Sequence, residues 1–125
     1  MKTSLVVGMG IGQLYSKILQ EMGHGVITVD SDPAKKADFT DIDEAIRECR
    51  LFDDVYICTP NYTHIKIARK LASVARYVFV EKPGVANADA WSQLVLDYPR
   101  TRFMMVKNNM WRDNIAEMRA AAQKA

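Results

Sequence analysis

Four short segments of the chain carry residue types suited to ligand binding or chemistry, and each follows an apolar run. They are Gly8-Met9-Gly10-Ile11-Gly12, Asp30, Thr59-Pro60-Asn61 and Glu81-Lys82-Pro83. Glycines let a backbone approach a phosphate closely, and a carboxylate can hold the two hydroxyls of a ribose. A lysine can donate a hydrogen bond to a hydroxyl or carbonyl compound, and acts as a base only where its pKa is lowered. Together these residue types suggest a nucleotide site with a reactive group beside it.

The elements that must position these residues alternate between strand and helix patterns. Short apolar runs predict strands at residues 4–7, 26–29, 55–59, 77–80 and 102–106. Helical spacing of apolar residues predicts helices over 11–22, 43–49, 61–75 and 87–95, and a last helix that begins near residue 111 and runs to residue 125. This alternation is typical of an α/β fold with a doubly wound parallel sheet, here as a single domain over residues 1–125. Ligands of such sheets bind at the carboxyl ends of the strands, where all four segments lie.

The glycine cluster departs slightly from the G-x-G-x-x-G pattern of dinucleotide-binding loops. Gly8 and Gly10 fit that pattern, whereas Gly12 comes one residue early and Gln13 occupies the expected position. The strand before the cluster and the amphipathic helix after it still favour a pyrophosphate-binding turn. In such a turn the phosphates face the free N–H groups of the helix N-terminus.

Asp30 follows Gly8 by 22 residues, close to the offset of about 20 at which an acid binds the ribose of NAD. A carboxylate there repels a 2′-phosphate, which favours NAD over NADP. Lys35 and Lys36 would weaken that preference if they folded back toward the site. The alternative interpretation is that Asp30 only forms a turn and that the two lysines lie on a solvated surface.

Composition restricts the function classes further. The 125 residues are 49% hydrophobic and 26% charged with a net charge of +2, which argues for a globular domain and against a nucleic-acid surface. No apolar run is long enough to span a membrane. Cys49 and Cys58 are expected to be reduced, which indicates a cytoplasmic protein. The two histidines and two cysteines have no metal-ligand spacing, so no metal site is expected.

The second half of the chain resembles the Gfo/Idh/MocA oxidoreductases. Its elements Thr59-Pro60-Asn61-Tyr62-Thr63-His64 and Glu81-Lys82-Pro83 match the T-P-N-x-x-H-like and E-K-P motifs that end neighbouring strands in that family. The resemblance runs from about Ser4 to the last predicted helix, which corresponds to the family's N-terminal half. It implies an NAD(P)-binding Rossmann fold and hydride transfer between a nicotinamide and a sugar, polyol or related small substrate.

The resemblance also implies roles for individual residues. The pyrophosphate would be held by Gly8, Met9, Gly10, Ile11 and Gly12, and the adenosine ribose by Asp30. The cofactor near its nicotinamide half would be lined by Thr59, Pro60, Asn61, His64, Glu81 and Lys82. Lys82 would also be the catalytic lysine, next to the reacting carbon.

Plainer roles exist for several of these residues. Lys82 could simply pair with Glu81 or with solvent at the end of a strand. His64 lies at a helix start, where structural support is expected in preference to proton transfer, and His24 is expected to be inert. Met22, Trp91, Trp111 and Met118 are expected to serve in packing.

The family's second, substrate-binding domain has no counterpart in these 125 residues. We therefore expect the chain to be an incomplete dehydrogenase by itself, with a second chain as one way to complete it. The alternatives are a stand-alone dinucleotide-binding, sensing or interaction module without catalysis, and an S-adenosylmethionine-binding fold. The apolar stripe of Trp111, Ile115 and Met118 predicts self-association into a homo-oligomer.

Overall fold

A computed structural model describes residues 2–10, 12–59, 63–81 and 88–106. Its described strands form one parallel sheet in the order β2-β1-β3-β4-β5. The strands are β1 (Thr3–Val7), β2 (Gly25–Val29), β3 (Phe52–Ile57), β4 (Ala75–Glu81) and β5 (Arg102–Val106). The parallel α/β architecture expected from the sequence is thus confirmed.

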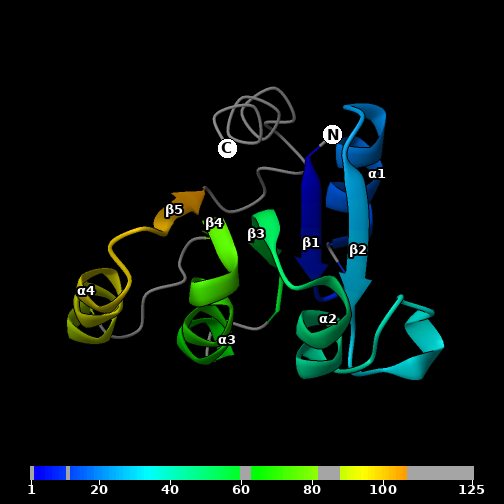
Figure 1. Cartoon of the computed structure of the whole chain (residues 1–125). Coiled ribbons are helices and arrows are strands. Elements are labelled where there is room, and N and C mark those ends of the chain that lie inside the picture. The colour runs from blue at the N-terminus through cyan, green and yellow to red at the C-terminus, as the bar shows by residue number, and fades with distance from the viewer. Residues whose placement is uncertain (1, 11, 60–62, 82–87, 107–125) are drawn as a thin grey trace.

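Helices cover both faces of the sheet. They are α1 (Gly12–Glu21), α2 (Ile42–Cys49), α3 (His64–Leu71) and α4 (Ala88–Asp97), with short 3-10 turns η1 (Pro33–Lys35) and η3 (Ala72–Val74). In Figure 1, α1 lies behind β1 and β2, while α2, α3 and α4 lie in front of the sheet. Trp91 of α4 is 7% exposed and lies in the core between the sheet and helices α2, α3 and α4. Its helical spacing predicted this packing role. None of the described helices combines the length and apolar character needed to cross a membrane.

Helix α1 ends where the chain must turn into β2. Gly23 has a φ of +87°, a backbone conformation that glycine adopts without strain. The N–H of His24 donates to the carbonyl of Leu19 at 3.0 Å, which closes the last turn in a Schellman-type arrangement. This termination places Gly25 beside Thr3 and starts the parallel pairing of β1 with β2.

The edge of β2 that faces away from β1 forms one isolated β-bridge with the chain that follows it. Phe39 forms an isolated parallel bridge with Val29, with N–H···O contacts of 3.1 Å from Phe39 to Thr28 and from Asp30 to Phe39. The chain therefore passes along β2 before it enters α2. Because β2 and β3 lie on opposite sides of β1, the winding reverses between β1 and β3. The loops that follow β1 and β3 diverge there and leave space for a ligand.

The strand limits differ from expectation mainly in β3. The strand begins at Phe52 and ends at Ile57, whereas the apolar run predicted 55–59. Asp54 belongs to the strand because it lies opposite Ser4 of β1, whose hydroxyl donates to its carboxylate. The last predicted helix, from about residue 111 to residue 125 with Trp111 and Met118, lies outside the described residues.

Candidate functional site

A cleft of about 670 Å³ opens over the carboxyl ends of β1, β2 and β3. The side chains and backbone around it come from the loops after these strands, the start of α2 and one side of α3. Its lining includes Gly8, Gly10, Asp30, Ser31, Cys58 and Thr59, and farther out Thr40, Asp41, Thr63, Lys66, Ile67 and Lys70. Volumes of this size are typical of small-molecule and cofactor sites.

The three loop glycines have three different surroundings. Gly8 has a φ of +94°, and a Cβ there would lie 2.8 Å from the carbonyl oxygen of Cys58. A Cβ on Gly12 would lie 2.8 Å from Cγ1 of Val6, so Gly12 allows α1 to pack closely on β1. No atom of the described residues lies within 4 Å of a Cβ on Gly10, which is exposed and faces the cleft. A tight turn, an open approach and a close helix contact are the requirements of a dinucleotide-binding loop.

Two hydrogen bonds link the glycine loop, the segment that follows β1 and begins with Gly8, to the end of β2. The N–H of Gly8 donates to the carbonyl of Val29 at 2.8 Å. The N–H of Met9 donates to Oδ2 of Asp30 at 2.7 Å, and the side chain of Met9 is buried against the α1 side of the sheet. The Met9 amide is thus already bonded within the protein, so a phosphate would use other amides of the loop.

Each carboxylate oxygen of Asp30 accepts one main-chain hydrogen bond, and the residue lines the cleft. Oδ1 accepts the N–H of Asp32 at 2.8 Å, while Oδ2 accepts that of Met9. A carboxylate oxygen has two lone-pair sites, so each oxygen retains one for a further donor such as a ribose hydroxyl.

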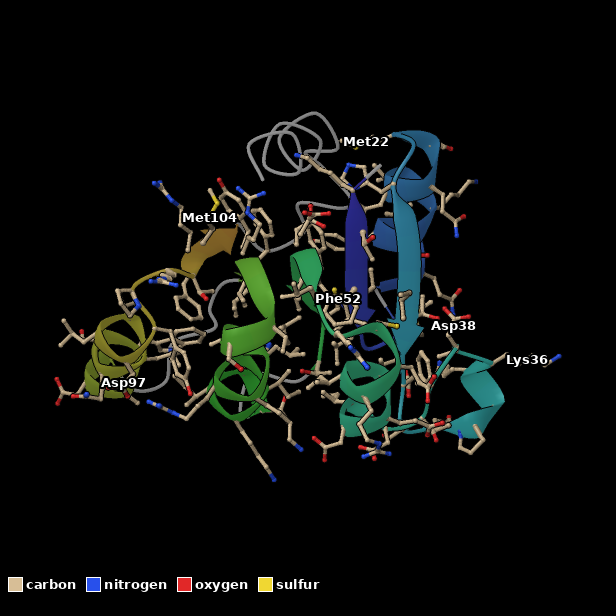
Figure 2. The ribbon with its side chains drawn as sticks, viewed as in Figure 1. Met22, Lys36, Asp38, Phe52, Asp97 and Met104 are labelled. Carbon is tan, nitrogen blue, oxygen red and sulfur yellow. The ribbon has the colours of Figure 1, made fainter. Side chains whose placement is uncertain are left out.

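The two lysines that follow Asp30 lie elsewhere. Lys35 and Lys36 are exposed in and after η1 and do not line the cleft. In Figure 2, Lys36 points away from the sheet at its outer edge. Neither lysine therefore compensates the negative charge of Asp30, as a 2′-phosphate would require.

The end of β3 forms the opposite wall of the cleft. Oγ1 of Thr59 lies 2.6 Å from Oγ1 of Thr63, and the carbonyl of Thr59 lies 2.7 Å from Nε2 of His64. Thr59 and Thr63 line the cleft, whereas His64 is 1% exposed and lies behind them. The geometry therefore gives His64 a supporting place, in line with the expectation of structural support.

The remaining candidates fall at the edge of the described chain. Glu81 is the last residue of β4 and pairs in register with Val106 of β5, on the same rim of the sheet as Thr59. Ile11, Pro60, Asn61 and Lys82 lie outside the described residues.

Sequence patterns did not reveal the outer part of the cleft. Lys66, Ile67 and Lys70 come from α3, and Thr40 and Asp41 precede α2. Nζ of Lys70 lies 3.0 Å from Oδ2 of Asp43, so an ion pair joins the two helices beside the cleft. The only available signal was the helical spacing of Thr63, Lys66 and Lys70, which a solvated helix face would also show.

The chain matches the family model described as "Oxidoreductase family, NAD-binding Rossmann fold" over residues 3–104. It belongs to the Gfo/Idh/MocA oxidoreductase family. The resemblance stated from the Thr59 and Glu81 motifs is therefore confirmed, and NAD is the cofactor for which this fold is named. No curated protein matches the chain.

Solved structures with the same fold include other oxidoreductases. The WlbA dehydrogenase from Bordetella pertussis, in complex with NADH and UDP-GlcNAcA, is 21% identical with a TM-score of 0.72, over 97% of this chain and 42% of its own. Apo scyllo-inositol dehydrogenase from Lactobacillus casei is 19% identical with a TM-score of 0.73, over 98% of this chain and 40% of its own. The Thermus thermophilus WlbA dehydrogenase, in complex with NAD and alpha-ketoglutarate, is 18% identical with a TM-score of 0.70, over 100% of this chain and 47% of its own. The chain thus spans less than half the length of these Gfo/Idh/MocA-type structures.

Proposed function

We propose that this chain binds NAD in the cleft and serves as the cofactor-binding half of a dehydrogenase acting on a sugar, polyol or related small substrate. The observation that carries the proposal is the carboxylate of Asp30, which lines the cleft and is oriented by the N–H groups of Met9 and Asp32. Its remaining lone pairs suit the adenosine ribose hydroxyls. The exposed backbone at Gly10 and the N-terminus of α1 suit the pyrophosphate.

When bound, NAD supplies the hydride acceptor or donor. The residues of this chain bind and orient it: Asp30 holds the ribose, Gly8 and Gly10 let the backbone approach the phosphates, and Thr59 forms the wall toward the nicotinamide half. In the proposed scheme Glu81 approaches the nicotinamide ribose. Lys82 hydrogen-bonds the reacting oxygen: as the neutral amine it accepts the proton of a hydroxyl that is oxidised, and as the ammonium it donates a proton to the oxygen of a carbonyl that is reduced.

The substrate is proposed to be held by polypeptide outside these 125 residues, in line with the longer relatives. A second chain is one source of that polypeptide, and self-association of this chain is part of the proposal. Val95 and Leu96 of α4, 48% and 73% exposed, offer apolar surface for it. Cys49 and Cys58, the two cysteines of the chain, are thiols and not a disulfide, which supports a cytoplasmic location.

Calorimetric titration of the chain with NAD, NADH, NADP and S-adenosylmethionine tests the proposal. We expect NAD and NADH to bind, NADP to bind more weakly because of Asp30, and S-adenosylmethionine not to compete. Absence of binding by every nicotinamide nucleotide at millimolar concentration would overturn the proposal. Binding without turnover of any polyol or sugar is the result expected of a cofactor half.

A further inference from the structure

His64 lies directly behind the wall of the cleft that Thr59 forms. Its side chain is 1% exposed and is absent from the cleft lining, whereas Thr59 and Thr63 are both part of that lining. Nε2 of His64 and the carbonyl oxygen of Thr59 are 2.7 Å apart. One link between His64 and a ligand in the cleft therefore passes through Thr59.

The chemistry of this contact determines which ring nitrogen carries the proton. A carbonyl oxygen only accepts, so Nε2 of His64 must donate. Nδ1 is also buried, and no partner accompanies it among the described residues. A second N–H at Nδ1 would be buried without an acceptor from this part of the chain, which favours the neutral ring with its proton on Nε2.

Thr59 in turn lies close to Gly8 of the glycine loop. Its Cγ2 lies 3.0 Å from the position that a Cβ on Gly8 would occupy, and the carbonyl oxygen of Cys58 lies 2.8 Å from the same position. The neighbouring N–H of Cys58 donates to the carbonyl of Val7 at 2.8 Å. A shift of Thr59 would therefore change the gap between the two loops that face each other across the winding reversal.

We propose that His64 is a positioning residue for NAD: its Nε2–H holds the carbonyl of Thr59, and thereby sets the distance between the end of β3 and the glycine loop. This inference rests on the proposed function of the cleft. It assigns His64 no contact with the cofactor and no proton transfer. It differs from a simple packing role because only a side chain with a donor at the Nε2 position can perform it.

Two substitutions of His64 separate the hydrogen bond from the volume. His64→Gln places an amide N–H near the position of Nε2, whereas His64→Leu fills similar space without a donor. His24→Leu is the matched control, because it removes the other histidine at the opposite end of the strands. All variants of the full chain would first be compared by thermal unfolding and then titrated with NAD by calorimetry below their unfolding transitions.

We expect His64→Leu to weaken NAD binding roughly tenfold, equivalent to about 1.4 kcal/mol. His64→Gln should stay within about threefold of the wild type, since its hydrogen bond is retained. Folded His24→Leu should bind like the wild type. Equal affinities of the Gln and Leu variants would overturn the positioning role while leaving NAD binding intact. A wild-type chain that binds no NAD would instead overturn the proposed function.

Nitrogen-15 NMR of the imidazole rings provides a test that does not depend on any variant folding. We expect His64 to show the Nε2–H tautomer at neutral pH, both without and with NAD. An Nδ1–H tautomer would overturn the inference, because that ring could not donate to Thr59.

Discussion

The main-chain N–H of Met9 donates to the carboxylate of Asp30 at 2.7 Å and so joins the glycine loop to the end of β2. Asp30 consequently has two tasks in the proposed site, because it binds the ribose and also holds the loop that receives the phosphates. Its second oxygen is fixed by the N–H of Asp32. The carboxylate is therefore oriented before any ligand arrives, which reduces the ordering that binding must impose.

The first prediction follows from these two tasks. Asp30→Ala should weaken NAD binding by about 1–3 kcal/mol, the range for loss of charge-assisted hydrogen bonds. Asp30→Asn should also weaken binding, because one of its two polar atoms is an amide nitrogen facing an N–H donor. Calorimetric titration with NAD measures both effects.

Asp32→Ala is the control for these variants. It removes the side chain that accepts from the N–H of Ala34 at 3.0 Å, but keeps the main-chain N–H that orients Asp30. Its affinity for NAD should match the wild type. An Asp30→Ala variant that binds NAD as tightly as the wild type would contradict the assignment of Asp30.

The second prediction separates the tasks of two loop glycines. Gly12→Ala should destabilise the fold by about 1–3 kcal/mol, since overpacking of a full core costs this much. Its new Cβ would lie 2.8 Å from Cγ1 of Val6, which is fully buried. Gly10→Ala should leave stability nearly unchanged, because a Cβ there meets no described atom within 4 Å, but should weaken NAD binding.

Urea unfolding and NAD titration of both variants distinguish these effects. A matched background is Val6→Ala, which removes Cγ1. In that background Gly12→Ala should cost much less stability than in the wild type. Equal destabilisation in both backgrounds would mean that the contact with Val6 does not set the requirement for glycine.

Much of the fold could be predicted because each strand is a short apolar run between clear helix patterns. The limits of β5, Arg102–Val106, agree with the prediction from its apolar run. The start of β3 could not be predicted in the same way. Asp53 and Asp54 look like loop residues in sequence, and only the pairing of Asp54 with Ser4 across the sheet shows why an acid belongs in the strand.

The candidate site divides along a similar line. Asp30 and Gly8 could be placed at the cleft from their spacing, because a strand end and a tight turn are local features. The early third glycine could not be interpreted, since its packing against Val6 depends on how α1 lies on β1. Lys66 and Lys70 reach the cleft only through the docking of α3 beside α2, a tertiary arrangement that local sequence patterns do not encode.

The third prediction concerns the pH dependence of stability. Burial raises the pKa of the Asp54 carboxyl above its usual value, and this outweighs the hydrogen bond from Ser4 and the positive charges of His24 and Lys2, which lower it. The folded state then binds this proton more tightly than the unfolded state. The contribution of Asp54 is therefore fully present below the unfolded pKa of about 4, and is lost as the pH rises through the folded pKa.

The stability difference between wild type and Asp54→Asn isolates that contribution. We expect the wild type to lose stability relative to the variant as the pH rises from about 4. Ser4→Ala removes a hydrogen bond that favours the ionised carboxylate, so it should extend the decline to higher pH. Urea unfolding at a series of pH values measures both trends, and a difference that grows in favour of the wild type with rising pH would refute this account.

The last prediction concerns the polar cluster around Asp54. Ser4, His24 and Asp54 have the composition of a hydrolytic triad, but the hydroxyl lies between the other two groups, and Ser4 and Asp54 are fully buried. Oγ of Ser4 is 2.8 Å from Nδ1 of His24 and donates its proton to the carboxylate of Asp54. While Asp54 is ionised its carboxylate only accepts, and the Ser4 hydroxyl has one proton, so Nδ1 of His24 then donates to Ser4.

His24 should therefore show the Nδ1–H tautomer at neutral pH, opposite to the Nε2–H tautomer expected for His64. The chain contains only these two histidines, so nitrogen-15 NMR can resolve both rings in one sample. Ser4→Ala removes the acceptor of His24, and should reduce its Nδ1–H population while leaving the ring of His64 unchanged. An Nε2–H tautomer of His24 in the wild type would show that the hydrogen bonds of the cluster run in the opposite direction, with Asp54 protonated.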